Sequence, residues 1–209
     1  MDAKLPRIPP SWVIGPFVTA RHVLGRAYRS LVPTTARVLE GSFGLIETKA
    51  LGAAAELVVV IGRAARRVSE EHALDHVLGY TCGDDISARD LQFGDTQWTR
   101  GKALDTFAPM GPWIVTADEI PDPQTLGIRC FVNGEVRQDD TTAHMLFPVA
   151  QLIAFITEAI TLKPGDVIYS GTPPGVGHAR QPPAYLQPGD TVRVEIDRIG
   201  TLEHQIVSA

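Results

Sequence analysis

The sequence has 209 residues, a length typical of one domain, and 44% of its residues are hydrophobic while 21% are charged. These fractions are ordinary for a globular protein and exclude a globally disordered chain. The net charge is −5 at pH 7, and the densest basic cluster (Arg63, Arg66 and Arg67) precedes two glutamates, a pattern typical of a solvated turn. The composition therefore argues against nucleic-acid binding.

Cysteine usage and apolar runs indicate the cellular context. Cys82 and Cys130 are the only cysteines, which excludes a disulfide framework and fits a reducing compartment. No apolar run approaches the roughly 18 residues of a membrane-spanning helix. Pro6, Pro9 and Pro10 would interrupt the apolar core of a signal peptide. We expect a cytoplasmic protein without a membrane partner.

The pattern changes along the chain. Residues 1–52 contain short apolar runs interrupted by Pro, Gly and Arg, and we treat them as an N-terminal segment. Residues 53–209 carry a clear element pattern, and the whole chain is expected to form one domain. The first clear element is Leu57–Ile61, an uninterrupted run typical of a strand buried on both faces. Ser69 and two following glutamates predict a short helix over 70–78, ended by Gly79.

The second half predicts mostly strands. We expect a strand over Trp113–Thr116 and a hairpin over Ile128–Arg137, in which Asn133-Gly134 suits a type I′ turn. Pro148 opens a helix whose apolar face is formed by Val149, Leu152, Ile153, Ile156 and Ile160.

Pro-Gly-Asp turns at 164–166 and 188–190 precede strands over Val167–Ser170 and Thr191–Ile196, and a last strand covers Thr201–Val207. Many short strands and only two predicted helices indicate a β-dominated α+β domain with a rolled or barrel-like sheet. No Gly-x-Gly-x-x-Gly follows a strand, so a dinucleotide-binding domain has no support.

Three polar features are candidates for chemistry. The stretch Gly83–Asp105 is rich in Asp, Arg, Gln and Lys, and it is either a long solvated loop or a structured functional segment. Glu56 enters an apolar strand, where an unpaired buried carboxylate costs several kcal/mol. It must therefore face water, pair with Lys or Arg, or bind a cation. Gly171–Gly177 is either a plain turn or a stiff loop that holds the Thr172 hydroxyl and adjacent backbone N–H groups, and it lacks the Lys-Ser/Thr of a phosphate-binding loop.

Four segments together carry a family resemblance: Asp84–Gln92, Trp98–Phe107, Pro109–Trp113 and Ser170–Gly177. In order and spacing they resemble motifs of the fumarylacetoacetate hydrolase (FAH) family, and in particular its 2-hydroxyhepta-2,4-diene-1,7-dioate isomerase and 5-oxopent-3-ene-1,2,5-tricarboxylate decarboxylase members. The resemblance implies a mixed β-roll with few short helices, a homodimer, and bound Mg²⁺ or Mn²⁺. It also implies a 2-oxo or 2-hydroxy-dienoic (di)carboxylic acid substrate, decarboxylated, isomerised or hydrolysed through a metal-bound enolate in aromatic-compound catabolism.

The resemblance also implies roles for individual residues. Glu56 and Asp85 fall on metal ligands, Lys102 on the lysine that steadies the enolate, and Arg89 on an arginine that lines the site. The substrate-contacting positions correspond to Gln92, Gly171 and Thr172. Hard cations such as Mg²⁺ take oxygen ligands and leave positions open for the oxygens of a 2-oxo acid.

The sequence departs from the family pattern in three places. Ala54 stands where the first glutamate of a Glu-x-Glu metal strand is expected, and Asp84 stands where the family usually has Asn. Leu31 and Thr34 replace a water-activating His and its Glu partner; His22 is the histidine near that position, and a satisfied or exposed side chain is favoured there over a relocated base. Glu47 would substitute for the missing metal carboxylate only if the chain folds it inward. We expect weaker metal binding and a site less suited to hydrolysis than to decarboxylation or tautomerisation. The alternative is a weakly active or non-catalytic subunit that pairs with a competent partner.

Overall fold

The computed structural model describes residues 48–94 and 97–207 in full and the backbone of residues 36–38. Eleven strands are defined in these ranges: β1 (Ala36–Val38), β2 (Leu51–Gly52), β3 (Ala55–Ile61), β4 (Val77–Asp84), β5 (Ser87–Ala88), β6 (Met110–Thr116), β7 (Gly127–Val132), β8 (Glu135–Thr141), β9 (Val167–Tyr169), β10 (Thr191–Ile196) and β11 (Gly200–Ile206). The α-helices are α1 (Arg89–Gly94) and α2 (Val149–Ala159). Short 3₁₀ helices are η1 (Glu70–His76), η2 (Trp98–Gly101), η3 (Pro123–Thr125), η4 (Thr142–His144) and η5 (Gly177–Ala179).

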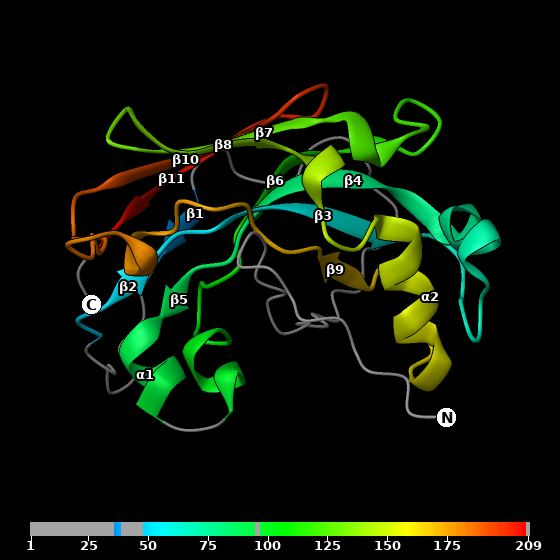
Figure 1. Ribbon diagram of the computed structural model, residues 1–209, viewed down its shortest axis with the longest axis horizontal. Helices are drawn as coiled ribbons and strands as arrows, with labels where there is room; N and C mark the ends of the chain where they lie inside the picture. Colours follow the sequence, from blue (N-terminus) through cyan, green and yellow to red (C-terminus); the bar gives the residue numbers. More distant parts are fainter. Residues whose placement is uncertain (1–35, 39–47, 95–96, 208–209) are drawn as a thin grey trace.

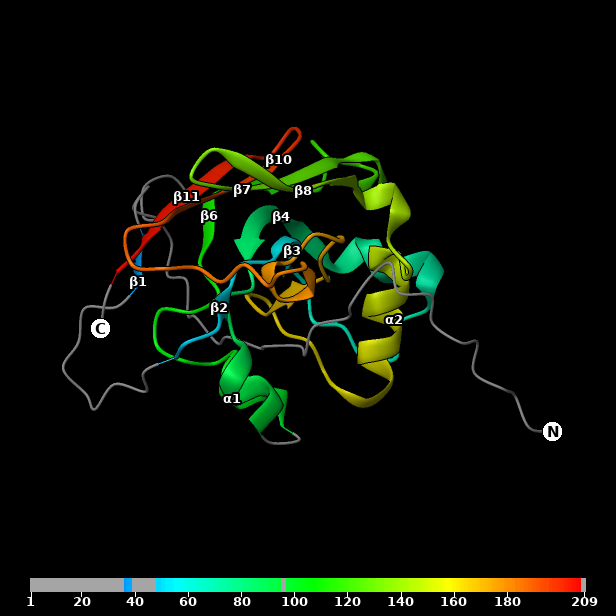
Figure 2. The same cartoon turned by 60° about the vertical axis from the view of Figure 1, so that its left-hand side comes forward.

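Two packed sheets form the body of the molecule. One sheet has the order β1-β11-β10-β7-β8 and the other the order β6-β4-β3-β9, while β2 and β5 form a small two-stranded ladder. Figures 1 and 2 show the five-stranded sheet lying over the four-stranded one, with α2 at one end of the molecule and α1 at the other. This arrangement is a sheet-rich α+β fold with few helices, which confirms the predicted fold class.

Strand β3 is central to the smaller sheet, and its position explains its sequence. It pairs antiparallel with β4 on one side and with β9 on the other. One face of the strand, with Leu57 and Val59, belongs to the main core between the sheets. The other face, with Val58 and Val60, packs in a second cluster with Tyr169. Burial on both faces is what an uninterrupted β-branched run predicts.

The predicted helix over 70–78 is only partly correct. Residues 70–76 form the 3₁₀ helix η1, and β4 begins at Val77. Gly79 does not end a helix but lies within β4, where a Cβ atom would meet the carbonyl oxygen of Val115 at 2.1 Å. Pairing with β3 and the close approach of β6 therefore override the local helical pattern in this segment.

The turn predictions hold in detail. Asn133 and Gly134 have φ values of 52° and 81°, and they join β7 to β8 as a type I′ turn requires. Gly165 and Gly189, in the two Pro-Gly-Asp turns, also have positive φ and precede β9 and β10. The predicted strands at 113–116 and 201–207 correspond to β6 and β11.

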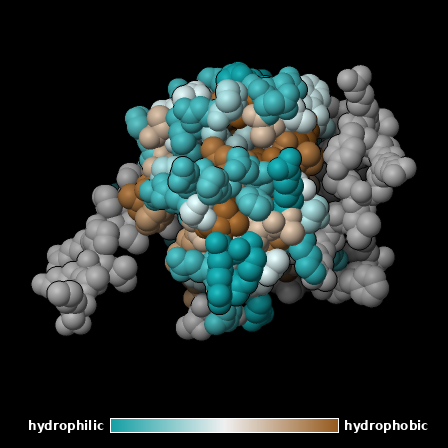
Figure 3. Space-filling model, turned by 90° about the vertical axis from the view of Figure 1, so that its right-hand side faces the viewer, coloured by the Kyte–Doolittle hydropathy of each residue, from teal (hydrophilic) through white to brown (hydrophobic). Residues whose placement is uncertain are grey.

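Helix α2 packs one face on the core and presents the other to solvent. Val149 and Ile153 are fully buried, whereas Phe155 is 67% exposed. Ile160, predicted on the buried face, lies beyond the helix and is exposed, because the backbone is extended at this C-cap residue. Figure 3 shows the side of the molecule that carries α2, where hydrophobic patches lie among hydrophilic side chains.

None of the helices in the described part of the chain is long and apolar enough to cross a membrane. The prediction that residues 1–52 form a distinct segment stays a prediction, because residues 1–35 and 39–47 lie outside those described.

Two substitutions on α2 test this packing. Ile153→Ala should lower the free energy of unfolding by about 2–5 kcal/mol, because it opens a cavity in the main core. Phe155→Ala, on the exposed face of the same helix, should change it by less than about 0.5 kcal/mol. Chemical denaturation of both variants is the measurement, and equal losses would contradict the assignment of the two faces.

Candidate active site

The start of β3 and the end of β4 lie side by side. In the antiparallel ladder Ala55 is opposite Asp84, and Glu56 is opposite Gly83. Glu56 therefore stands at the same end of the sheet as Asp85, which follows β4 directly. The charge of Asp85 acts on Glu56 strongly enough to raise its pKa. Two acids 29 positions apart in the sequence are thus brought together, as the family resemblance implied.

Glu56 is almost completely removed from water, with 1% of its surface exposed. Its Oε2 accepts a hydrogen bond of 2.8 Å from the backbone N–H of Gly171. Burial, followed by the charge of Asp85, holds the pKa of Glu56 well above its ordinary value. A position facing water is therefore wrong. The charges of Lys102 and Arg89 both act on this carboxyl, so pairing with Lys or Arg and binding of a cation both stay open.

Asp85 and Lys102 form a buried ion pair, in which the Lys102 ammonium contacts Oδ2 of Asp85. Only 7% of Asp85 and 4% of Lys102 are exposed. Burial raises the pKa of Asp85, and the nearby ammonium opposes that rise. Lys102 follows directly after η2, so the second motif segment, Trp98–Phe107, places the Lys102 ammonium beside the two carboxylates.

Arg89 and Gln92 extend the site from helix α1. The Arg89 guanidinium donates a 2.7 Å hydrogen bond from Nη1 to Oε1 of Gln92, which is buried. Burial lowers the pKa of Arg89, while the charges of Asp85, Tyr185 and Glu56 raise it. Its buried Nε has no hydrogen-bond partner among the described residues. The Arg89 guanidinium thus lies near both acids, and its Nε–H is available to donate a hydrogen bond to a ligand.

The loop at 171–177 is fixed by a glutamine that the sequence analysis did not single out. Gln138 of β8 donates from Nε2 to Oγ1 of Thr172 at 2.8 Å and to the carbonyl of Pro173 at 2.7 Å. Its Oε1 accepts from the backbone N–H of Ala55 at 2.9 Å. One buried side chain therefore ties the loop to the start of β3. The only sequence signal for Gln138 was its place as a polar residue that alternates with strand residues, and this signal is weak.

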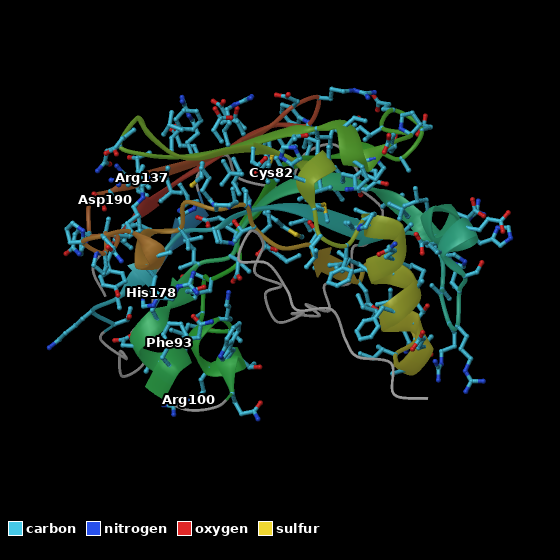
Figure 4. The ribbon with its side chains drawn as sticks, viewed as in Figure 1. Cys82, Phe93, Arg100, Arg137, His178 and Asp190 are labelled. Atoms are coloured by element: carbon cyan, nitrogen blue, oxygen red, sulfur yellow. The ribbon has the colours of Figure 1, made fainter. Side chains whose placement is uncertain are left out.

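In its described residues (83–94 and 97–105) the polar stretch is a structured segment and not a solvated loop. It contains β5, α1 and η2, and it carries five of the buried polar side chains: Asp84, Asp85, Ser87, Gln92 and Lys102. Phe93 is 54% exposed, and its ring lies 4.9 Å from that of His178 on η5. Figure 4 shows these two labelled side chains approaching each other from α1 and η5. The stretch is therefore structured, and its functional role stays a prediction.

A separate cavity of about 170 Å³ lies beside the loop rather than at the carboxylates. It is lined by Arg137, Gln138, Gly175, Tyr185, Leu186 and Asp190, among others. The sequence candidates at positions 22, 31, 34 and 47 lie outside the described residues.

Comparisons with known proteins settle the family. Residues 11–207 match the model described as fumarylacetoacetate (FAA) hydrolase, C-terminal, which is nearly the whole chain. The chain belongs to the fumarylacetoacetate hydrolase family. It is 50% identical over 155 residues to the mitochondrial oxaloacetate tautomerase fahd2 of Xenopus laevis. That alignment covers 73% of this chain and 49% of the relative, so the chain spans about half the length of the curated relatives it matches.

Solved structures agree with this family assignment. A fumarylacetoacetate hydrolase from Exiguobacterium antarcticum is 44% identical with a TM-score of 0.76, covering 78% of this chain and 58% of its own. A 2-hydroxyhepta-2,4-diene-1,7-dioate isomerase from Mycobacterium marinum is 44% identical with a TM-score of 0.70, covering 77% and 60%. A fumarylpyruvate hydrolase from Pseudomonas aeruginosa, in complex with Mn²⁺ and pyruvate, is 30% identical with a TM-score of 0.74, covering 84% and 72%. The relatives named here are hydrolases, an isomerase and a tautomerase.

The donor set suits a weakly held divalent cation. The described residues contain no group of three or more His, Cys, Asp or Glu side chains that could hold a metal. Glu56 and Asp85 provide two buried carboxylates, and Mg²⁺ is commonly held by one or two carboxylates plus water and substrate oxygens. A cation there would also offset the repulsion that raises the pKa of Glu56. Two carboxylates, and Ala54 in place of a third, therefore fit a cation that the substrate helps to bind.

The raised pKa of Glu56 predicts a pH-dependent stability. Above the ordinary value of 4.5 the folded carboxyl keeps its proton while the unfolded one loses it, so stability falls as pH rises toward the folded pKa. In chelator, the free energy of unfolding should therefore fall between pH 5 and pH 8 in the wild type, and fall less in Glu56→Gln. Denaturation curves at the two pH values measure this.

Glu203→Gln is the matched control for this prediction, because residue 203 is exposed on β11. It should keep the wild-type pH dependence. Parallel pH curves for the wild type and Glu56→Gln would contradict the account of this carboxyl.

Proposed function

We propose that the chain acts on a 2-oxo acid of the oxaloacetate or acylpyruvate type, by keto–enol tautomerisation or decarboxylation, with weakly bound Mg²⁺ or Mn²⁺. The observation that carries this proposal is the buried meeting of Glu56, Asp85 and Lys102. Burying two acids and an ammonium is costly unless they serve each other or a ligand. The oxaloacetate tautomerase activity named for the Xenopus relative supports the substrate class.

In this proposal Glu56 and Asp85 would hold the cation, which when bound supplies Lewis acidity toward a carbonyl oxygen. Glu56 is already oriented by the N–H of Gly171, so its Oε1 remains for a cation. Asp85 is oriented by its backbone N–H, which donates to the carbonyl of Ala54 at 2.9 Å. Before any ligand arrives, the Glu56 carboxylate is therefore held by a backbone N–H and the Asp85 carboxylate by the Lys102 ammonium.

Lys102 and Arg89 provide the positive charge that the reaction needs. When a proton leaves the carbon beside the carbonyl, or CO₂ leaves it, negative charge moves to the carbonyl oxygen. An ammonium held in a water-poor site stabilises that charge strongly. Lys102 is 4% exposed, and its partner Asp85 keeps it at the site. Arg89, with an unpartnered buried Nε, suits a substrate carboxylate.

Tautomerisation and decarboxylation fit the described site better than hydrolysis does. Hydrolysis needs a base that activates water. Within the described ranges His204 is buried against Asp84, and His178 is bonded to the hydroxyl of Tyr185. No described hydrogen bond or ion pair joins either imidazole to Glu56, Asp85 or Lys102, so the contacts favour reactions in which the charged groups do most of the work.

A second candidate function rests on Ala54. The loss of one expected glutamate favours a weakly active or non-catalytic subunit that pairs with a competent partner. A homodimer is the association that the family resemblance implies, and light scattering of the purified chain tests it. The two functions differ in one outcome, which is whether the chain alone turns over a 2-oxo acid.

Activity assays on three variants test the first function. Purified protein should speed the loss of the enol absorbance of oxaloacetate beyond the rate with Mg²⁺ or Mn²⁺ alone. Lys102→Met should lower kcat by about 10²–10³-fold, as expected for a group that stabilises developing charge. Asp85→Asn should remove the dependence on the cation. Lys163→Met, an exposed lysine, is the control and should change nothing. A wild-type rate equal to that of the cation alone would reject this function.

Restoring the missing acid tests the metal assignment. Ala54 is buried but, unlike Ala53 and Ala55, belongs to neither hydrophobic cluster, and strand alternation places it on the side of Glu56. Ala54→Glu should tighten Mn²⁺ binding about tenfold, which is about 1.4 kcal/mol. Ala54→Gln matches its size without the charge and should not. Calorimetric titration measures both, and equal affinities would show that residue 54 does not face the cation.

A further inference from the structure

Asp84 and His204 form a buried pair behind the two carboxylates. His204 Nε2 lies 2.9 Å from Asp84 Oδ2, and neither side chain is exposed to any extent. A carboxylate only accepts hydrogen bonds, so Nε2 carries the hydrogen and donates it. The two residues are 120 positions apart, and they join β4 of one sheet to β11 of the other.

The second carboxylate oxygen of Asp84 is hydrogen-bonded to the backbone just before β3. Its Oδ1 accepts a 2.7 Å hydrogen bond from the backbone N–H of Ala54. The carbonyl of the same residue accepts a 2.9 Å hydrogen bond from the backbone N–H of Asp85. Ala54 is therefore held at both its N–H and its carbonyl by two successive aspartates. Glu56 follows two residues later, so this short bridge sets the spacing between the two candidate ligands.

His204 is well placed to fix Asp84 in this arrangement. It lies within β11, where its backbone is paired with Val192 on β10 and with Ala36 on β1. The imidazole therefore projects from a strand that is paired with another strand on each side, which fixes its backbone. Its Nδ1 has no hydrogen-bond partner in the described part of the chain, where the hydrogen bond of this ring is the one to Asp84.

A purely stabilising role accounts poorly for such a pair. Removing two polar partners from water is costly, and a well-packed apolar pair of similar size is often as stable or more so. Outer residues that orient metal ligands are a known use of such hydrogen bonds, and losing one typically costs about 10–100-fold in metal affinity or activity.

We propose that His204 is a positioning residue: through Asp84 and the Ala54 bridge, it holds Asp85 and Glu56 at the separation that a divalent cation requires. The proposal rests on the proposed function and deepens it. His204 itself touches neither cation nor substrate. Its effect reaches the site through hydrogen bonds of 2.9, 2.7 and 2.9 Å in sequence.

The test compares two amide substitutions at one position. The amide nitrogen of His204→Gln reaches about as far as Nε2 and can still donate to Asp84, whereas His204→Asn is too short. Mn²⁺ affinity is measured by calorimetry on the folded, full-length chain, with kcat and KM for oxaloacetate beside it. We expect His204→Asn to lose about tenfold or more in Mn²⁺ affinity and His204→Gln to stay within about threefold of the wild type.

Leu202→Val is the stability control, because Leu202 is buried two residues earlier on the same face of β11. It should lower stability without lowering Mn²⁺ affinity. Equal Mn²⁺ affinities in the wild type and His204→Asn would overturn the proposal. A loss of Mn²⁺ affinity above tenfold in His204→Gln would also overturn it, and this second result applies even if His204→Asn does not fold. A wild-type chain that binds no Mn²⁺ would instead reject the proposed function on which the inference rests.

Discussion

The repulsion between buried acids is the constraint around which the site is organised. Glu56 and Asp85 lie out of water at one end of a sheet, and the charge of Asp85 raises the pKa of Glu56. Charges in such a place persist only when something offsets them. Here the offsets are the Lys102 ammonium on Asp85 and the Gly171 N–H on Glu56. A cation bound to the second oxygen of each carboxylate would offset these negative charges further.

The fold supplies this arrangement through backbone contacts. Antiparallel pairing of β3 with β4 brings positions 56 and 85 to the same end of the sheet. Gln138 ties the start of β3 to the Thr172 loop, and Asp84 ties the residue before β3 to β11 through His204. The site thus depends on strands from both sheets. Rigid strands beneath a few polar side chains are a common basis for precise ligand geometry.

Much of this could be predicted from the sequence, and the failures have physical causes. The two-sided burial of β3 and the Asn133-Gly134 turn follow from local pattern and were confirmed. The helix expected up to Gly79 was cut short because strand pairing, a non-local term, competes for Val77. The motif resemblance found Glu56, Asp85 and Lys102, since those residues are marked by type and order. Gln138 and His204 were missed because their partners lie 34 or more positions away.

The central claim is that Glu56 and Asp85 share one divalent cation. Crystals grown with Mn²⁺ and oxalate, a mimic of a 2-oxo-acid enolate, test it most directly through anomalous scattering from manganese. The account predicts one strong peak within bonding distance of both carboxylates, with oxalate bound to the same ion and Lys102 nearby. A peak elsewhere, or an unchanged Asp85–Lys102 pair with no manganese beside Glu56, would contradict it.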